Sequence, residues 1–173
     1  MGFLTAVGLK EGLTLEINSL GCTVCRPPYR DELLAFLRQR TDDLCGNCQE
    51  RLDRNPLRVL DCKTPGCKAI AQEAPALSGH LCEGCDAHFA GLRATLDALE
   101  LPYLHNPLMV RGLDYYNRTA FEVTTNALGA QNAVAAGGRY DGLVQEMGGK
   151  EPIPAIGFAM GLERLTLLLS DDH

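Results

Sequence analysis

The chain has 173 residues, of which 46% are hydrophobic and 22% charged, and its net charge is −6. This length suits one ordinary domain or two small ones, and the composition excludes wholesale disorder. The negative charge argues against a surface built mainly to bind phosphate backbones, because such a surface needs clustered Lys and Arg. No apolar run approaches the roughly 20 residues that span a bilayer, and the first residues lack a leader pattern. We therefore expect a cytoplasmic protein without membrane contact.

Hydrophobic periodicity and turn residues predict the elements of the first half of the chain. In chain order these are a strand over 13–20, helices over 29–40 and 45–55, a short strand over 56–62, a turn at 64–67 and a long helix over 82–99. The long helix is expected to bury one stripe, made of Phe89, Leu92, Leu96 and Leu99. A boundary between two modules is expected near Leu101 to Pro107, because all eight cysteines precede it.

The second half is expected to be mainly antiparallel sheet. Residues 108–116 and 119–125 are predicted to pair as strands about a turn at Asn117 and Arg118. Residues 132–149 read as a strand, a turn at Gly137 and Gly138 and a helix, and residues 154–170 as a strand and a helix starting near Leu162. The predicted fold class is therefore α+β, an antiparallel sheet with helices, plus a small cysteine-rich α/β module.

The eight cysteines form four closely spaced pairs, Cys22 with Cys25, Cys45 with Cys48, Cys62 with Cys67, and Cys82 with Cys85. Thiolates at such spacing can fill two corners of a tetrahedron around Zn²⁺, so the pairs predict one or two structural zinc sites. Buried thiols or a redox motif are the alternatives. The consecutive combination of the first two pairs and of the last two is slightly favoured. His80 and His88 could substitute as ligands, but are more simply solvent-facing polar residues.

Three segments carry candidate chemistry in the second half. The first gathers Arg111, Asp114, Tyr115 and Tyr116, which suggests a ligand pocket about as strongly as an exposed hairpin. The second places Gly137 and Gly138 before Arg139, Tyr140 and Asp141, where a tight turn alone explains the glycines. The third puts Arg164 in the first turn of a helix, where it could meet phosphate or simply be solvated.

The blocks RGLDYYNRTAFEV, AAGGRYDGLV and PAIGFAMGLERL, in this order, resemble the signature segments of histidyl-tRNA synthetases. The third is similar to motif 3 of class II synthetases, and LEINSLGC, NPLRVLDCK and AQEAPAL resemble the insertion region of the family. The resemblance implies three parts: a catalytic-core strand in 1–21, a cysteine-rich insertion domain in 22–103, and the C-terminal part of the class II catalytic domain in 104–173. It also implies a ligase that activates histidine with ATP and Mg²⁺, transfers it to the histidine-specific tRNA, and works as a homodimer.

The same resemblance assigns roles to single residues. Arg111 would be the catalytic arginine, which stabilises negative charge at the α-phosphate, and with Arg164 it would bind ATP. The histidine pocket would be formed by Asp114, Tyr115, Tyr116, Gly137, Gly138 and Tyr140.

The chain also departs from the family pattern. It holds neither motif 1 nor motif 2 nor an anticodon-binding domain, so we expect the isolated chain to be inactive. The alternative functions are a synthetase-like regulatory paralogue that binds histidine or a partner without charging tRNA, and a zinc-stabilised RNA-binding module.

Overall fold

The computed structural model describes residues 1–112, 115–129 and 132–170. Its strands are β1 (Leu13–Ser19), β2 (Leu104–His105), β3 (Asn117–Thr125), β4 (Ala133–Arg139) and β5 (Ile156–Met160). Its α-helices are α1 (Gly2–Ala6), α2 (Arg26–Arg38), α3 (Gly46–Arg54), α4 (Pro65–Gln72), α5 (Glu83–Ala98), α6 (Leu143–Glu146) and α7 (Leu162–Ser170). Short 3-10 helices are η1 (Thr41–Asp43), η2 (Pro56–Val59), η3 (Leu77–His80) and η4 (Asn126–Leu128).

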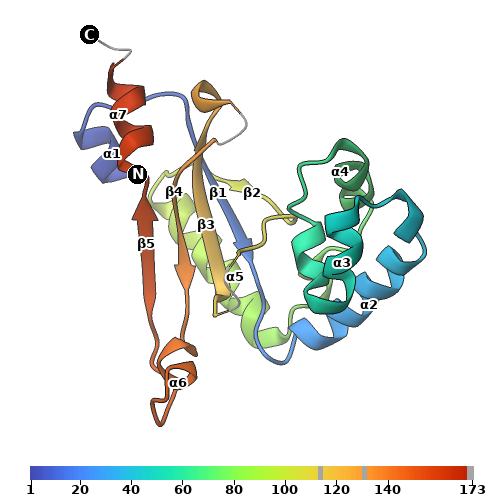
Figure 1. Ribbon diagram of the computed structural model, residues 1–173. Coiled ribbons are helices and arrows are strands. Elements are labelled where there is room, and N and C mark those ends of the chain that lie inside the picture. The colour runs from blue at the N-terminus through green and yellow to red at the C-terminus, as the bar shows by residue number, and fades with distance from the viewer. Residues whose placement is uncertain (113–114, 130–131, 171–173) are drawn as a thin grey trace.

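Within the described residues the strands form one sheet in the order β2-β1-β3-β4-β5 (Figure 1). The long pairings, β1 with β3, β3 with β4 and β4 with β5, are antiparallel, and only β2 runs parallel to β1. The predicted α+β fold with a mainly antiparallel sheet is therefore confirmed.

The two faces of the sheet have different coverings. One face carries Val123, against which Leu4 of α1 and Leu165 of α7 pack, and α5 lies along the same face through Phe89 and His105. The other face looks toward the helical part of the chain that contains α2, α3 and α4 (Figure 1). Since side chains alternate along a strand, Ala120, Glu122 and Thr124 of β3 share this second face.

The helical part, residues 26–80, has its own core. Tyr29, Leu33 and Leu37 of α2 are almost completely buried, and the core also includes the thiols of Cys48 and Cys67. Prolines 27 and 28 stand in the first turn of α2, where a missing N–H costs nothing because the first amides of a helix have no partner inside it. No α-helix among the described residues is long and apolar enough to cross a bilayer.

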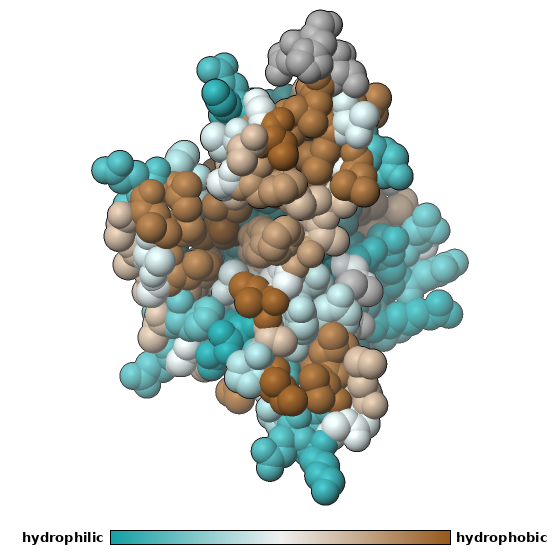
Figure 2. Space-filling view, turned by 90° about the vertical axis from the view of Figure 1, so that its left-hand side faces the viewer, coloured by the Kyte–Doolittle hydropathy of each residue, from teal (hydrophilic) through white to brown (hydrophobic). Residues whose placement is uncertain are grey.

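Strand β5 forms one edge of the described sheet and is apolar on an exposed side. Ile156 is 68% exposed and Phe158 64% exposed, and Leu162 beside them is 72% exposed. Figure 2 views the molecule from this side and shows brown apolar areas separated by polar ones.

Several sequence predictions are confirmed. The strand over 13–20 is β1, and the helices over 29–40, 45–55 and 82–99 are α2, α3 and α5. The strand and helix over 154–170 are β5 and α7, and the last helix begins at Leu162 as expected. The buried stripe of α5 is only partly correct, because Phe89 is buried whereas Leu99, at the C-terminal end, is 61% exposed.

Predictions for the proline-containing segments are wrong. Residues 56–62 were expected as a strand, but Pro56 starts the 3-10 helix η2. The turn expected at 64–67 is instead the beginning of α4, whose first residue is Pro65. In both places the fixed φ of proline suits a helical first turn better than an extended chain.

The hairpin expected about Asn117 and Arg118 is also wrong, because both residues lie inside β3. Residues 108–112 form no strand: the Nδ2 atom of Asn18 donates hydrogen bonds to the carbonyl oxygens of Pro107 and Met109 instead. Gly137 and Gly138 likewise form no turn but continue β4. A side chain from β1 thus holds the loop of residues 106–112 over the sheet without a backbone ladder.

Candidate functional site

A cluster of three tyrosines lies at the start of β3 and the end of β4. The ring centroids of Tyr115 and Tyr116 are 4.7 Å apart, and Tyr140 stands edge-on to both, at 5.7 Å from Tyr115 and 6.1 Å from Tyr116. Tyr116 is buried against Leu20, Met109 and Ala120. The cluster offers phenol groups beside apolar walls, an arrangement able to hold a small ring that has hydrogen-bonding atoms.

The two glycines of β4 are required by close packing next to this cluster. A Cβ atom on Gly138 would lie 2.6 Å from the carbonyl oxygen of Thr119 and 2.9 Å from Cδ1 of Tyr116. A Cβ atom on Gly137 would lie 2.6 Å from Cβ of Phe158. Any larger residue would push neighbouring strands apart, so the glycines allow the tyrosine rings to approach the sheet.

Asp141 fixes the chain just after Tyr140. Its carboxylate accepts hydrogen bonds from Nε of Arg139 at 2.7 Å, Nδ2 of Asn117 at 3.1 Å and the backbone N–H of Ala155 at 3.1 Å. Partial burial opposes ionisation, but these three donors outweigh it and lower the pKa of Asp141. The network joins the beginning of β3 to the end of β4 beneath the tyrosines.

Arg111 lies on the loop above the sheet and forms an ion pair with Glu122 of β3. Its guanidinium carbon is 5.4 Å from the ring centre of Tyr116, and its buried Nε has no hydrogen-bond partner among the described residues. Burial raises the pKa of Glu122, while the charge of Arg111 opposes this rise. The carboxylate of Glu122 thus fixes the guanidinium of Arg111, whose buried Nε is a donor that no described group satisfies.

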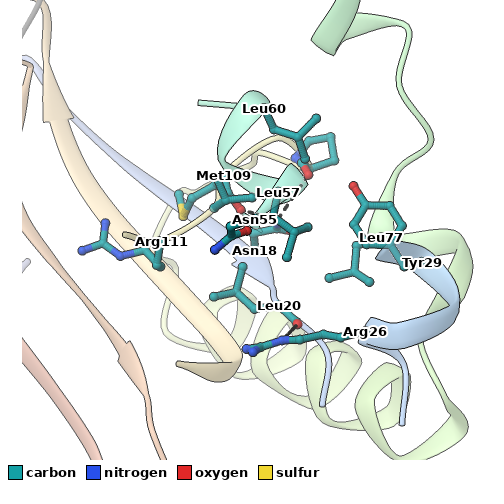
Figure 3. Close-up of a pocket in the computed structure, with 12 residues that line it drawn as sticks. Asn18, Leu20, Arg26, Tyr29, Asn55, Leu57, Leu60, Leu77, Met109 and Arg111 are labelled. Carbon is teal, nitrogen blue, oxygen red and sulfur yellow. Dashed lines mark hydrogen bonds between the residues drawn. The ribbon is translucent and has the colours of Figure 1, made fainter. Parts of the chain in front are cut away.

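Two hollows flank this loop. A narrow one, of about 40 Å³, lies between the loop and the helical part (Figure 3). In this view the guanidinium of Arg111 points away from the other lining residues, toward the sheet.

A larger and more polar cavity, of about 300 Å³, lies between the loop and the second face of the sheet. Its charged lining residues are Glu16, Asp61, Lys63, Lys68 and Glu122. Glu16 stands directly opposite Glu122 in the β1–β3 register.

The structure does not bring every predicted site residue together. Arg111, Tyr115, Tyr116, Tyr140 and Gly138 share one region. Arg164 lies in the first turn of α7, where its Nη1 donates a hydrogen bond to the carbonyl oxygen of Ala133 at the start of β4. Asp114 lies outside the described residues.

Sequence reasoning missed Glu122 and Asn117, both of which contact residues of the candidate site. The carboxylate of Glu122 pairs with Arg111, and Asn117 bonds to Asp141 through both its side-chain atoms. Alternation along TAFEVTT placed Glu122 on one face of a strand, but only the register shows that this is the face below Arg111.

The eight cysteines gather in two groups of four, each able to hold a metal ion. Cluster 1 consists of Cys22, Cys25, Cys82 and Cys85, and cluster 2 of Cys45, Cys48, Cys62 and Cys67. Within each cluster the four sulfur atoms lie within 4.8 Å of one another. The consecutive pairing that the sequence slightly favoured is wrong. Cys22 and Cys25 instead join Cys82 and Cys85, because the start of α5 lies next to the segment that follows β1. Neither His80 nor His88 belongs to a cluster, and Nε2 of His80 is 3.1 Å from Glu32.

Each cluster holds at least one thiol whose pKa is lowered, and the largest decreases are those of Cys22 and Cys45. Burial alone would raise the pKa of Cys22, but hydrogen bonds from the backbone N–H groups of Cys25 and Val24 outweigh it and lower that pKa to about 6. The backbone N–H of Cys48 and the thiol of Cys67 lower the pKa of Cys45 to about 6. A thiolate is the form that binds metal, so both clusters have a ready first ligand.

The mainly antiparallel five-stranded sheet of the described residues, with helices packed on it, matches the class II synthetase fold. The comparisons with known proteins give the particular family. The sequence profile described as "Histidyl-tRNA synthetase" matches residues 30–165. The chain belongs to the histidyl-tRNA synthetase family.

Relatives and solved structures agree with this membership. The chain is 58% identical to the histidine–tRNA ligase of Trichlorobacter lovleyi over 92% of its own length and 57% identical to that of Geobacter metallireducens over 99%. It spans only 39% and 41% of the length of these two relatives. The crystal structure of apo S. aureus histidyl-tRNA synthetase superposes with a TM-score of 0.74 at 34% identity, covering 99% of this chain and 41% of that one.

Proposed function

We propose that the protein to which this chain belongs is a histidine–tRNA ligase. It would join histidine to ATP, releasing pyrophosphate, and pass the histidyl group to the histidine-specific tRNA. The observation that carries this proposal is the convergence of Arg111 and the three tyrosines at one site, in a chain 58% identical to a curated histidine–tRNA ligase. A regulatory paralogue is less well supported, because the relatives at 57% and 58% identity are named as ligases.

In this proposal Arg111 is the catalytic arginine. When the histidine carboxylate attacks the α-phosphorus, negative charge grows on the phosphate oxygens as the bond to pyrophosphate breaks. A guanidinium aimed at that point stabilises the transition state more than the ground state. The ion pair with Glu122 holds the guanidinium in place before ATP binds.

The tyrosine cluster is proposed to bind the histidine side chain. Phenol groups of Tyr115, Tyr116 and Tyr140 can hydrogen-bond the imidazole nitrogens, which purely apolar walls could not distinguish from a hydrocarbon ring. Asp114 is proposed to join this pocket, and Gly137 and Gly138 to give it room. Arg164 is proposed to bind ATP, which enters as its Mg²⁺ complex, from the start of α7.

The cysteine clusters are proposed to hold one structural Zn²⁺ each. Four sulfurs at about 2.3 Å from a tetrahedral zinc ion stand about 3.8 Å from each other. The observed separations of Cys22 from Cys25 and Cys82 are 3.6 and 3.8 Å, and Cys45 is 3.9 Å from Cys62. Four thiolates leave no open position, so the ion would contribute stability and not chemistry. We further propose that the whole protein acts as a homodimer in the cytoplasm.

The test is histidine-dependent ATP–pyrophosphate exchange by the full-length protein. Arg111→Ala is expected to lower kcat by about 10²- to 10³-fold, as does the loss of a donor that acts on the transition state. Arg38→Ala is the matched control, because Arg38 forms only an exposed pair with Asp53 at 3.4 Å. Histidine binding without exchange would instead favour the regulatory paralogue. The chain of residues 1–173 alone is expected to give no exchange.

A further inference from the structure

Cluster 1 lies at the point where the helical part leaves the sheet and returns to it. Cys22 and Cys25 follow β1 and precede α2, while Cys82 and Cys85 stand at the beginning of α5. The backbone N–H of Cys82 donates a hydrogen bond to Sγ of Cys25 at 3.1 Å. Cluster 1 therefore connects the segment that leaves the sheet after β1 with the segment that returns to it at α5, which are 57 residues apart in sequence.

The same point is bonded directly to the start of β3. The carbonyl oxygen of Gly21 accepts a hydrogen bond from the backbone N–H of Arg118 at 2.7 Å, and the N–H of Leu20 donates to the carbonyl oxygen of Arg118. Leu20 in turn packs against Tyr116. One peptide bond, between Gly21 and Cys22, and one hydrogen bond, from Arg118 to Gly21, therefore connect cluster 1 to the beginning of β3.

The backbone at Gly21 is tightly constrained. It adopts φ +64°, and a Cβ atom there would lie 3.1 Å from Cβ of Cys25. Arg118 also has a positive φ, of 52°, at an irregularity in the β3–β4 register. Positive φ is costly for a residue with a side chain, so the surrounding contacts must hold Arg118 in place.

Cluster 2 contacts a different part of the site, the loop that carries Arg111. Cys62 lines the larger cavity together with Glu122, Met109 and Val110. Leu108 and Val110 pack against the helical core that includes the thiols of cluster 2.

A second contact joins the helical part to the same loop. A Cβ atom on Gly112 would lie 2.6 Å from Nη1 of Arg58, a residue of η2, so this side chain lies against the loop. The N–H of Cys62 bonds to the carbonyl oxygen of Val59 at the end of η2. Cluster 2 therefore anchors the segment that supports the loop from the helical side.

We propose that the two cysteine clusters position different halves of the active site: cluster 1 sets the histidine pocket through Arg118 and Tyr116, and cluster 2 sets the loop that carries Arg111. This inference rests on the proposed ligase function and on metal binding by both clusters. The cysteines act as positioning residues, since none of them touches a substrate. Loss of cluster 1 should weaken the affinity for histidine, and loss of cluster 2 should lower kcat for pyrophosphate exchange.

The first arm of the test uses cluster 1 in the full-length protein. Cys82→Ser is expected to reduce zinc from two ions per chain to one and to raise the Kd for histidine about tenfold, because a small displacement of binding groups has effects of that order. Amide hydrogen exchange of residues 116–120 should become faster. Cys82→His, which keeps a metal ligand, should restore both zinc and affinity.

The second arm uses cluster 2 in the same way. Cys62→Ser is expected to lose one zinc ion, to lower kcat for pyrophosphate exchange about tenfold and to speed amide exchange in residues 108–112. Its Kd for histidine should rise less than that of Cys82→Ser. Cys62→His should restore kcat.

A variant that keeps all ligands guards against simple unfolding. Gly21→Ala strains the link between cluster 1 and Arg118, so it should raise the Kd for histidine while both zinc ions remain bound. The inference is overturned if Cys82→Ser and Cys62→Ser shift the same parameter equally, or if Gly21→Ala leaves the Kd unchanged. Wild-type protein without zinc would overturn the metal assignment as well. Wild-type protein with zinc but no exchange would overturn the ligase function alone.

Discussion

The helical part and the sheet are held together by different means. The helical part consists of short helices, such as α3 with nine residues and α4 with eight, which are too short to be stable alone in water. Its core is completed by cysteine thiols. The sheet has long antiparallel ladders, a separate apolar core and close contacts at glycines. One chain thus combines a region expected to depend on metal with a region expected to fold without it.

Metal removal should produce the largest difference in stability between the helical part and the sheet. Structural zinc contributes on the order of 10 kcal/mol to peptides that fold only around the metal. A strong chelator at neutral pH, which removes both ions together, should therefore unfold the helical part, whereas loss of one ion leaves the other cluster in place. Hydrogen exchange of the full-length protein should show lost protection over residues 26–80, while β4 and β5 keep theirs. Equal loss in both regions would mean that the sheet also depends on the clusters.

The sheet should instead be sensitive to added volume at its glycines. Gly137→Ala places a methyl group 2.6 Å from Cβ of Phe158, and such overpacking typically costs about 1–3 kcal/mol. The urea midpoint should fall with zinc content unchanged. Gly91→Ala in α5 is the control, since no described atom beyond its chain neighbours and the backbone of its own helix lies within 4 Å of the added carbon, and alanine favours a helix. A lower midpoint for Gly91→Ala would contradict this account.

The smallest effect concerns the polar network that joins β3 to β4. Because the pKa of Asp141 is lowered in the folded protein, its charge stabilises the fold at pH values above about 4, and this contribution is lost as the pH falls further. Asp141→Asn should therefore cost about 1–2 kcal/mol at pH 7 and progressively less below pH 4. Urea midpoints of both proteins from pH 7 to pH 3 measure the difference. A gap of constant size would show that the charge contributes nothing.

Local patterns predicted most elements but not the partners of distant segments. Alternation found β1, and helical spacing found α2 and α5, because these signals depend on neighbours in the sequence. The cysteine spacing indicated metal sites, yet which pairs meet depends on α5 returning to the end of β1. Register likewise decides that Glu122 lies beneath Arg111.

The errors at proline and glycine have a common physical origin. Pro56 was read as the start of a strand and Pro65 as part of a turn, although the structure uses both to begin helical turns. Gly137 and Gly138 were read as a turn, although neighbouring strands approach too closely there for any side chain. Glycine permits several conformations, and the fixed φ of proline suits both a turn and the first turn of a helix. The packing of distant chain segments selects one of these.

The exposed edge strand β5 has a practical consequence. Its outer edge presents backbone N–H and C=O groups that no described strand pairs, next to Ile156 and Phe158, which are 68% and 64% exposed. Such an edge can accept a strand from another molecule and so seed aggregation. Residues 1–173 prepared alone should therefore become turbid as the concentration rises, unless another segment covers this edge.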